Sequence, residues 1–130
     1  MLNRYDHAVP QWQVRLLGRM RVERDGQSPV HFRTLATEAV FAYLALRLGE
    51  EVSREVLASE IWPAAEDLAR GRNLRTALSS LRQSFAEALG ANRQSAWLDP
   101  SRFDVDVLRF RRELDPALYR GRLLEGYDGR

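Results

Sequence analysis

One stretch decides the fold: DLARGRNLRTALSSLRQSF, residues 67–85. Its large apolar side chains recur at steps of four, three and four residues, which places them on one side of an α-helix: Leu74, Leu78, Leu81 and Phe85. Between Asp67 and Glu87 there is no carboxylate, although the chain has 18 of them. Arginines and small polar residues therefore form the other side of the helix, a combination typical of helices that read DNA. An ordinary solvated helix face is the alternative, because many charged faces contact only water.

We expect the polar side of this helix to contact DNA. Arginine presents a planar fork that pairs with phosphate or guanine, and asparagine can read adenine. Phosphate is the more frequent destination for any one arginine. Steps of three or four residues group five side chains on one side of the helix: Arg72, Arg75, Thr76, Ser79 and Arg82. The complete set of DNA-binding candidates on this helix is Arg70, Arg72, Asn73, Arg75, Thr76, Ser79, Ser80 and Arg82.

Two shorter helices are predicted before this stretch. Thr34 or Thr37 can cap the first of them, and Gly49 can end it in the left-handed conformation. Ser53 can cap the second helix, and Pro63 ends it.

The connection to the long helix is short. It has four or five residues, with Asp67 as a candidate cap. We expect the long helix to run to about Leu89, before Gly90. A helix, a tight turn and a longer helix follow one another in the order of a helix-turn-helix.

Alternating apolar residues predict short strands before the helices. Residues 11–23 indicate two strands or one bulged strand. The Asp25-Gly26 turn then leads to a return strand that contains Val30 and Phe32. We therefore expect a small antiparallel sheet at the N-terminal end.

A second group of strands is predicted after the long helix. Residues 95–98 and 102–105 form a C-terminal hairpin around the turn 99–101, and this hairpin would be a wing. A further short helix is expected from Val107, ending before Pro116.

The predicted fold is α+β: a winged helix-turn-helix with an N-terminal antiparallel sheet, a three-helix core and a C-terminal hairpin. We divide the chain into an N-terminal arm at residues 1–10, a winged-helix DNA-binding domain at 11–105 and a short appendage at 106–130.

Several motifs occur in one order between residues 12 and 89: VRLLG (14–18), VERDG (22–26), YLALR (43–47), VSRE (52–55), LASEIWP (57–63) and NLRTALSSLR (73–82). In this order they resemble the DNA-binding domain of the SARP-type bacterial transcriptional activators, a winged helix of the response-regulator class. Two later motifs resemble the opening of the helical activator domain that follows in that family: DVDVLRF (104–110) and YRGRLLEG (119–126). This second domain would be vestigial or truncated here.

The resemblance implies a function and partners. The third helix would enter the major groove of double-stranded DNA, at direct-repeat promoter sites, and two or more copies would bind together. The wing would touch the minor groove, which adds Arg93 and Arg102 to the DNA-binding candidates. RNA polymerase is a second expected partner, with Glu60, Glu66 and Asp67 as candidates for contact with it. Simple solvation of these carboxylates is the alternative.

Composition excludes several classes of function. The 130 residues are 45% hydrophobic, which suits one main domain with a real core. Cysteine is absent and the two histidines are far apart, so we expect neither disulfides nor a metal site. No glycine-rich phosphate loop or catalytic triad occurs, so we expect no enzyme and no cofactor. Without an apolar run near 18 residues or a leader-like start, we expect a cytoplasmic protein that does not contact a membrane.

The charges are segregated along the chain. Residues 50–67 contain six carboxylates and only Arg54 as a base, and the sign reverses directly afterwards. Such segregation favours two surfaces with different partners. All 20 basic residues are arginine, for which codon bias in a GC-rich genome is the simpler cause. Because the net charge is only +2, a second function stays open: a winged-helix interaction module that has lost DNA binding and docks a protein.

Overall fold

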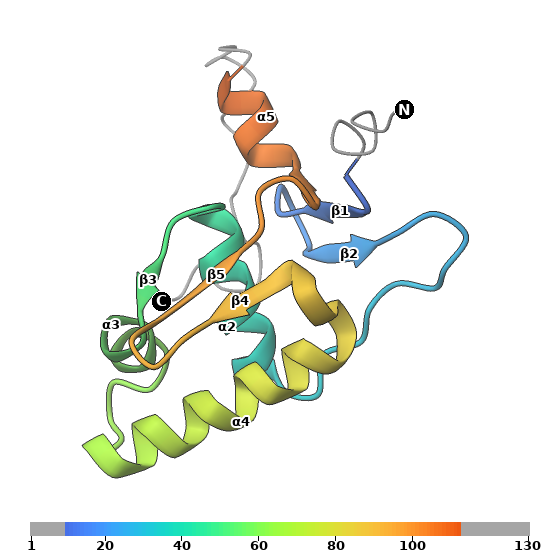
Figure 1. Ribbon diagram of the computed structural model, residues 1–130. Helices are drawn as coiled ribbons and strands as arrows, with labels where there is room; N and C mark the ends of the chain where they lie inside the picture. Colours follow the sequence, from blue (N-terminus) through green and yellow to red (C-terminus); the bar gives the residue numbers. More distant parts are fainter. Residues whose placement is uncertain (1–9, 113–130) are drawn as a thin grey trace. The chain divides into compact units, whose positions relative to one another are not determined.

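The computed structural model describes residues 10–112, which are drawn in colour in Figure 1. These residues divide between two compact units. Of the described residues, unit 1 contains 10–30 and 100–112, and unit 2 is His31–Asp99. Both contain helices and strands, so the predicted α+β class is confirmed. Within the described residues, no helix is long and apolar enough to cross a membrane.

Unit 2 contains three α-helices: α2 (Leu35–Leu46), α3 (Arg54–Ile61) and α4 (Asp67–Phe85). The predicted caps are confirmed for the first two. The hydroxyl of Thr34 accepts a hydrogen bond from the amide of Thr37 at 3.0 Å, and that of Ser53 accepts one from the amide of Val56 at 3.2 Å. Gly49 has a φ of 87°, the left-handed conformation predicted for it. It does not end the helix, however, because α2 stops at Leu46 with Arg47 as its C-cap.

The apolar side of α4 is buried as predicted. Leu74, Leu78, Leu81 and Phe85 are all at most 4% exposed. On α2, Phe41 stacks against Phe85 with ring centroids 4.8 Å apart. Burial of each large side chain contributes about 1.5–3 kcal/mol, so this side of α4 is fixed against the core and its polar side must face outward.

The end of α4 differs from the prediction. The helix stops at Phe85 instead of about Leu89, because Ala86 adopts a φ of 49° that leaves the helical path. A 3-10 turn, η1 (Ala86–Ala88), and the strand β4 (Leu89–Ala91) follow. Gly90 therefore lies inside a strand, where a Cβ atom would overlap the ring of Trp97.

The start of α4 also differs slightly from the prediction. Asp67 is the first helical residue, and Glu66 occupies the cap position without a side-chain cap hydrogen bond. The first turn of α4 must therefore be held by other contacts.

Unit 2 contains one antiparallel sheet, in the order β3 (Val52–Ser53), β5 (Ser95–Leu98) and β4. The chain turns between β4 and β5 at Asn92, Arg93 and Gln94. Two backbone amides, of Gln94 and Ser95, donate to the Oδ1 atom of Asn92 at 2.8 and 2.7 Å. The hairpin that follows α4 is therefore β4–β5.

The hairpin predicted for residues 95–105 is wrong. Its first strand, β5, is correct, but the expected return strand is β6 (Phe103–Val105), which pairs with β1 (Trp12–Arg15) in unit 1. The true partner of β5 is β4, which was not predicted because Leu89 also fits the apolar period of the long helix.

Unit 1 contains a mixed sheet in the order β2 (Arg21–Glu23), β1 and β6. The pairing of β1 with β2 is antiparallel, as predicted, but β1 and β6 are parallel. Val30 and Phe32 form no return strand. Val30 instead makes a single backbone hydrogen bond to Val22, at 2.8 Å, and Phe32 lies in unit 2, where it contacts the ring of Phe41.

The helix α5 (Asp106–Arg112) follows β6 in unit 1, near the start predicted for the last helix. The carboxylate of Asp106 accepts hydrogen bonds from the amides of Leu16 at 2.8 Å and Leu17 at 3.3 Å. Of the predicted N-terminal arm only Pro10 is described, and the expected end of the last helix and the motif at 119–126 lie outside the described residues.

Candidate nucleic-acid interface

The helix α4 presents an exposed row of polar side chains opposite its buried side. We call this the α4 row, and its members are the five residues predicted to share one side: Arg72, Arg75, Thr76, Ser79 and Arg82. Within residues 10–112, the side chains of its three arginines make no ion pair or hydrogen bond. Their guanidinium forks are therefore available to an anionic partner.

Asn73 and Ser80 flank the α4 row and are half-buried. They line a hollow of about 350 Å³ between α4 and the start of α2. Its other lining residues are Arg33, Thr34, Ala36, Thr37, Trp62, Thr76 and Ala77. Asn73 and Ser80 therefore border the surface that the row forms, and a partner lying along the row would meet the hollow at its edge.

A second hollow, of about 330 Å³, lies on the other flank of α4, against α3. Its lining mixes charges of both signs: Arg54, Glu55, Ala58, Asp67, Arg70, Gly71, Leu74 and Arg75. The two flanks thus differ chemically, because the hollow beside α2 contains arginine but no carboxylate among its lining residues.

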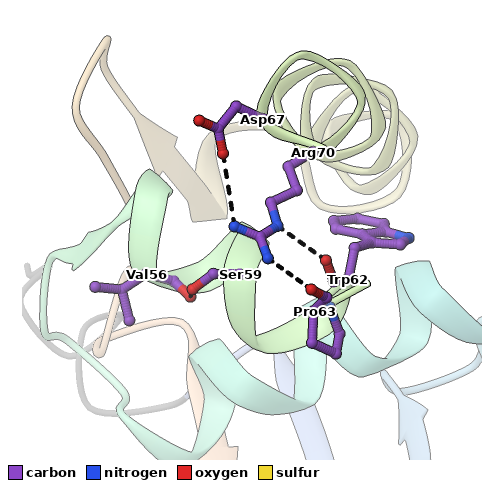
Figure 2. Close-up of polar contacts among 6 residues, drawn as sticks. All are labelled: Val56, Ser59, Trp62, Pro63, Asp67 and Arg70. Atoms are coloured by element: carbon purple, nitrogen blue, oxygen red, sulfur yellow. Dashed lines mark hydrogen bonds and ion pairs between the residues drawn. The ribbon is translucent and has the colours of Figure 1, made fainter. Parts of the chain in front are cut away.

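Arg70 differs from the other arginine candidates because its guanidinium is engaged within unit 2 (Figure 2). Nε donates to the backbone carbonyl of Trp62 at 3.0 Å, and Nη2 donates to that of Pro63 at 2.7 Å. Nη1 lies 3.7 Å from a carboxylate oxygen of Asp67. The side chain is 26% exposed, and it spans the turn between α3 and α4.

The two candidates assigned to the wing lie in different units. Arg93 is exposed in the turn of the β4–β5 hairpin, in unit 2. Arg102 lies in unit 1, where Nη1 donates to the side-chain oxygen of Gln11 at 3.1 Å and the backbone carbonyl accepts from the amide of Trp12 at 3.0 Å. Arg102 is therefore not part of the hairpin that follows α4.

The three acidic candidates are exposed around the turn that leads into α4. Glu60 lies near the end of α3, and Glu66 and Asp67 lie where α4 begins. A carboxylate in the first turn of a helix is favourable because it faces the positive end of the helix dipole. Asp67 thus has a structural use irrespective of any partner.

Gln83 is a candidate that the sequence analysis missed. It is exposed on α4 and follows Thr76 by seven residues and Ser79 by four, so it belongs to the same side of the helix and extends the α4 row by one residue beyond Arg82. Glutamine can read adenine through two hydrogen bonds in the major groove. The seven-residue spacing was available in the sequence and could have identified it.

The described residues bring together no group of three or more histidines or carboxylates that could hold a metal ion. Comparisons with models of protein families, with curated proteins and with solved structures found no match. The functional assignment therefore depends on the chemistry of the residues themselves.

Proposed function

We propose that the protein is a sequence-specific transcriptional regulator that binds double-stranded DNA, with α4 in the major groove. The observation that carries this proposal is the α4 row, in which three unpaired arginines alternate with short polar side chains on a helix held by its buried side. Arginine contacts to phosphate would supply affinity, and contacts to base edges would supply sequence preference. The exposed side chain of Gln83 would extend the base-reading surface.

In this proposal, α3 and α4 are the two helices of a helix-turn-helix, and unit 2 has the winged form. The β4–β5 hairpin takes the place of the wing, with Arg93 toward the minor groove. The resemblance to the SARP-type activators agrees with this assignment, and it suggests direct-repeat sites occupied by several copies. Arg102 no longer belongs to the proposed surface, because it is tied to β1.

A protein-docking module is the second candidate function, and one observation favours it. Leu68 is 84% exposed at the start of α4, directly after the exposed carboxylates of Glu66 and Asp67. Exposed apolar side chains beside acidic ones can contact a partner protein, such as RNA polymerase. The two candidate functions respond differently to salt, because only DNA binding releases many condensed counterions.

Selection from random DNA tests the proposed function. The purified chain is mixed with a pool of random duplexes at two salt concentrations, and the bound fraction is sequenced. We expect a repeated motif to be enriched and the binding constant to fall steeply with salt, with a log-log slope of about −0.9 for each phosphate contacted. A folded chain that enriches no motif would favour the docking module.

A matched pair of variants connects this binding to α4. Arg75→Gln removes one charge from the α4 row, whereas Arg15→Gln removes one exposed charge from β1 in unit 1. We expect Arg75→Gln either to relax the preference at one base position or to reduce the salt slope by about one. We expect Arg15→Gln to do neither. Equal effects of the two variants would mean that only net charge matters, which contradicts the assignment to α4.

A further inference from the structure

The side chain of Arg70 connects the first turn of α4 to the end of α3, as Figure 2 shows. We propose that Arg70 is a positioning residue of the DNA interface: it sets the direction in which α4 leaves the turn and does not itself contact phosphate. This inference rests on the proposed function, and it separates Arg70 from the other arginines of α4.

The turn after α3 needs such a contact because it exposes carbonyl groups. The last carbonyls of a helix lack partners within the helix, and they carry its partial negative charge. Trp62 is the cap of α3, and its carbonyl accepts from the amide of Ala65 at 3.2 Å as well as from Arg70. The Pro63 carbonyl accepts from the same guanidinium. A planar cation with several donors can satisfy both groups at once.

The start of α4 also depends on Arg70, because no side chain caps this helix. Glu66 supplies no side-chain cap, so the first turn lacks the usual hydrogen bond from a capping side chain. The backbone amide of Arg70 donates to the carbonyl of Glu66 at 2.8 Å, while its side chain holds the two carbonyls just before. One residue therefore fixes the first turn of α4 through both its backbone and its side chain.

Small changes in the direction of α4 would disturb base reading. The α4 row, extended to Gln83, covers 11 helical steps, or about 16 Å at 1.5 Å per residue. A tilt of about 10° would displace one end of the row by about 3 Å relative to the other, which is more than a hydrogen bond tolerates. Loss of the Arg70 contacts should therefore affect sequence preference before it affects general attraction to DNA.

A phosphate contact by Arg70 would predict the opposite behaviour. Its Nε and Nη2 atoms already donate to backbone carbonyls, and Nη1 lies near Asp67. Arg72, two residues later, is exposed and makes no ion pair or hydrogen bond within the described residues, so it is the matched control. Substitution of either arginine by glutamine changes the net charge equally.

The experiment compares Arg70→Gln, Arg70→Lys and Arg72→Gln in the full chain. The probes are the duplex that the wild type enriches and a shuffled duplex of the same length and composition, each at several salt concentrations. For Arg70→Gln we expect the affinity for the enriched duplex, divided by that for the shuffled duplex, to fall about tenfold or more. The salt slope measured on the shuffled duplex should stay the same as for the wild type. For Arg72→Gln we expect the slope to decrease by about 0.9 if it contacts phosphate. Arg70→Lys keeps the charge but loses the fork, so we expect it to resemble Arg70→Gln.

A measurement on the free protein checks the turn itself. Hydrogen exchange of the Ala65 amide should accelerate in Arg70→Gln and stay unchanged in Arg72→Gln, because only the first change frees the carbonyls of the turn. If Arg70→Gln does not fold, Arg70→Lys supplies the same comparison, since it retains the charge and the apolar stem of the side chain.

Three results would overturn the inference. A reduced salt slope with an unchanged specificity ratio in Arg70→Gln would identify a phosphate contact. Full restoration of the ratio by Arg70→Lys would mean that charge alone matters. A wild-type chain that enriches no duplex would refute the proposed function and, with that function, any role of Arg70 in DNA reading. The first two results would refute only the positioning role of Arg70.

Discussion

Gly90 and Trp97 face one another across the β4–β5 hairpin, and substitution of the glycine gives the sharpest test of this part of the fold. A Cβ atom at Gly90 would overlap three atoms of the indole ring, so either the ring or the strand must shift. Overpacking of this kind costs about 1–3 kcal/mol. Replacing glycine by alanine in a strand also regains about 0.5–1 kcal/mol of backbone entropy. The two effects together give a net cost of about 0–2.5 kcal/mol, and we expect Gly90→Ala to lower the free energy of unfolding by about 1 kcal/mol, near the middle of that range.

A double-mutant cycle with Trp97→Ala identifies the cause. Without the indole ring only the entropy gain remains, so Gly90→Ala should stabilise by about 0.5–1 kcal/mol and its sign should reverse. Urea unfolding followed by circular dichroism measures all four chains. The same cost for Gly90→Ala in both backgrounds would refute the proposed clash.

Gly71→Ala is the matched control for this substitution. Gly71 lies inside α4, and a Cβ atom there would meet nothing within 4 Å. Glycine in a helix interior is about 0.8–1.0 kcal/mol less favourable than alanine, so we expect this variant to be more stable than the wild type by about that amount. The same chemical change should thus have opposite effects at the two positions.

Two further predictions concern unit 1 and the DNA surface. Asp106→Asn should destabilise unit 1 by about 1–2 kcal/mol, because each carboxylate oxygen accepts one backbone N–H and the NH₂ group of asparagine cannot accept. Urea unfolding measures the loss. The control Asp25→Asn, at an exposed turn, should show none. Gln83→Ala should relax the preference at one base position of the selected duplex and leave the salt slope unchanged; an unaltered sequence preference would remove Gln83 from the reading surface.

The helices could be predicted because their signals are local. Apolar steps of three and four identify the buried side of α4. The hydroxyl group of Ser53 identifies the start of α3, and those of Thr34 and Thr37 limit the start of α2 to two positions three residues apart. Each signal lies within a single helix or at its end and can be interpreted from that segment alone. The candidate residues on the exposed side of α4 followed from the same period, and all members of the α4 row are exposed.

The pairings of β4 and β6 could not be predicted, because nothing local specifies them. Strands β4 and β6 have three residues each, too few to establish an alternating pattern, and β4 begins with a leucine that also fits the preceding helix. The partner of β6 is decided by packing with a strand near the other end of the chain. Phe103 pairs with Trp12, and their rings are stacked with centroids 6.4 Å apart.

The role of Arg70 was equally hidden in the sequence. Helical spacing places Arg70 closer to the buried side than the other arginines, but spacing says nothing about the carbonyls that lie beside it. Those carbonyls are presented by the turn at Trp62 and Pro63, whose conformation is a property of the folded unit.

The parallel pairing of β1 with β6 has a consequence for how the chain folds during synthesis. The contact between Leu16 and Asp106 joins residues 90 positions apart, so unit 1 stays incomplete until nearly all of the described chain has left the ribosome. Unit 2 is continuous in sequence and is translated entirely within that interval. Because contacts between distant residues form slowly, we expect the inserted unit to fold first and the flanking segments to join last.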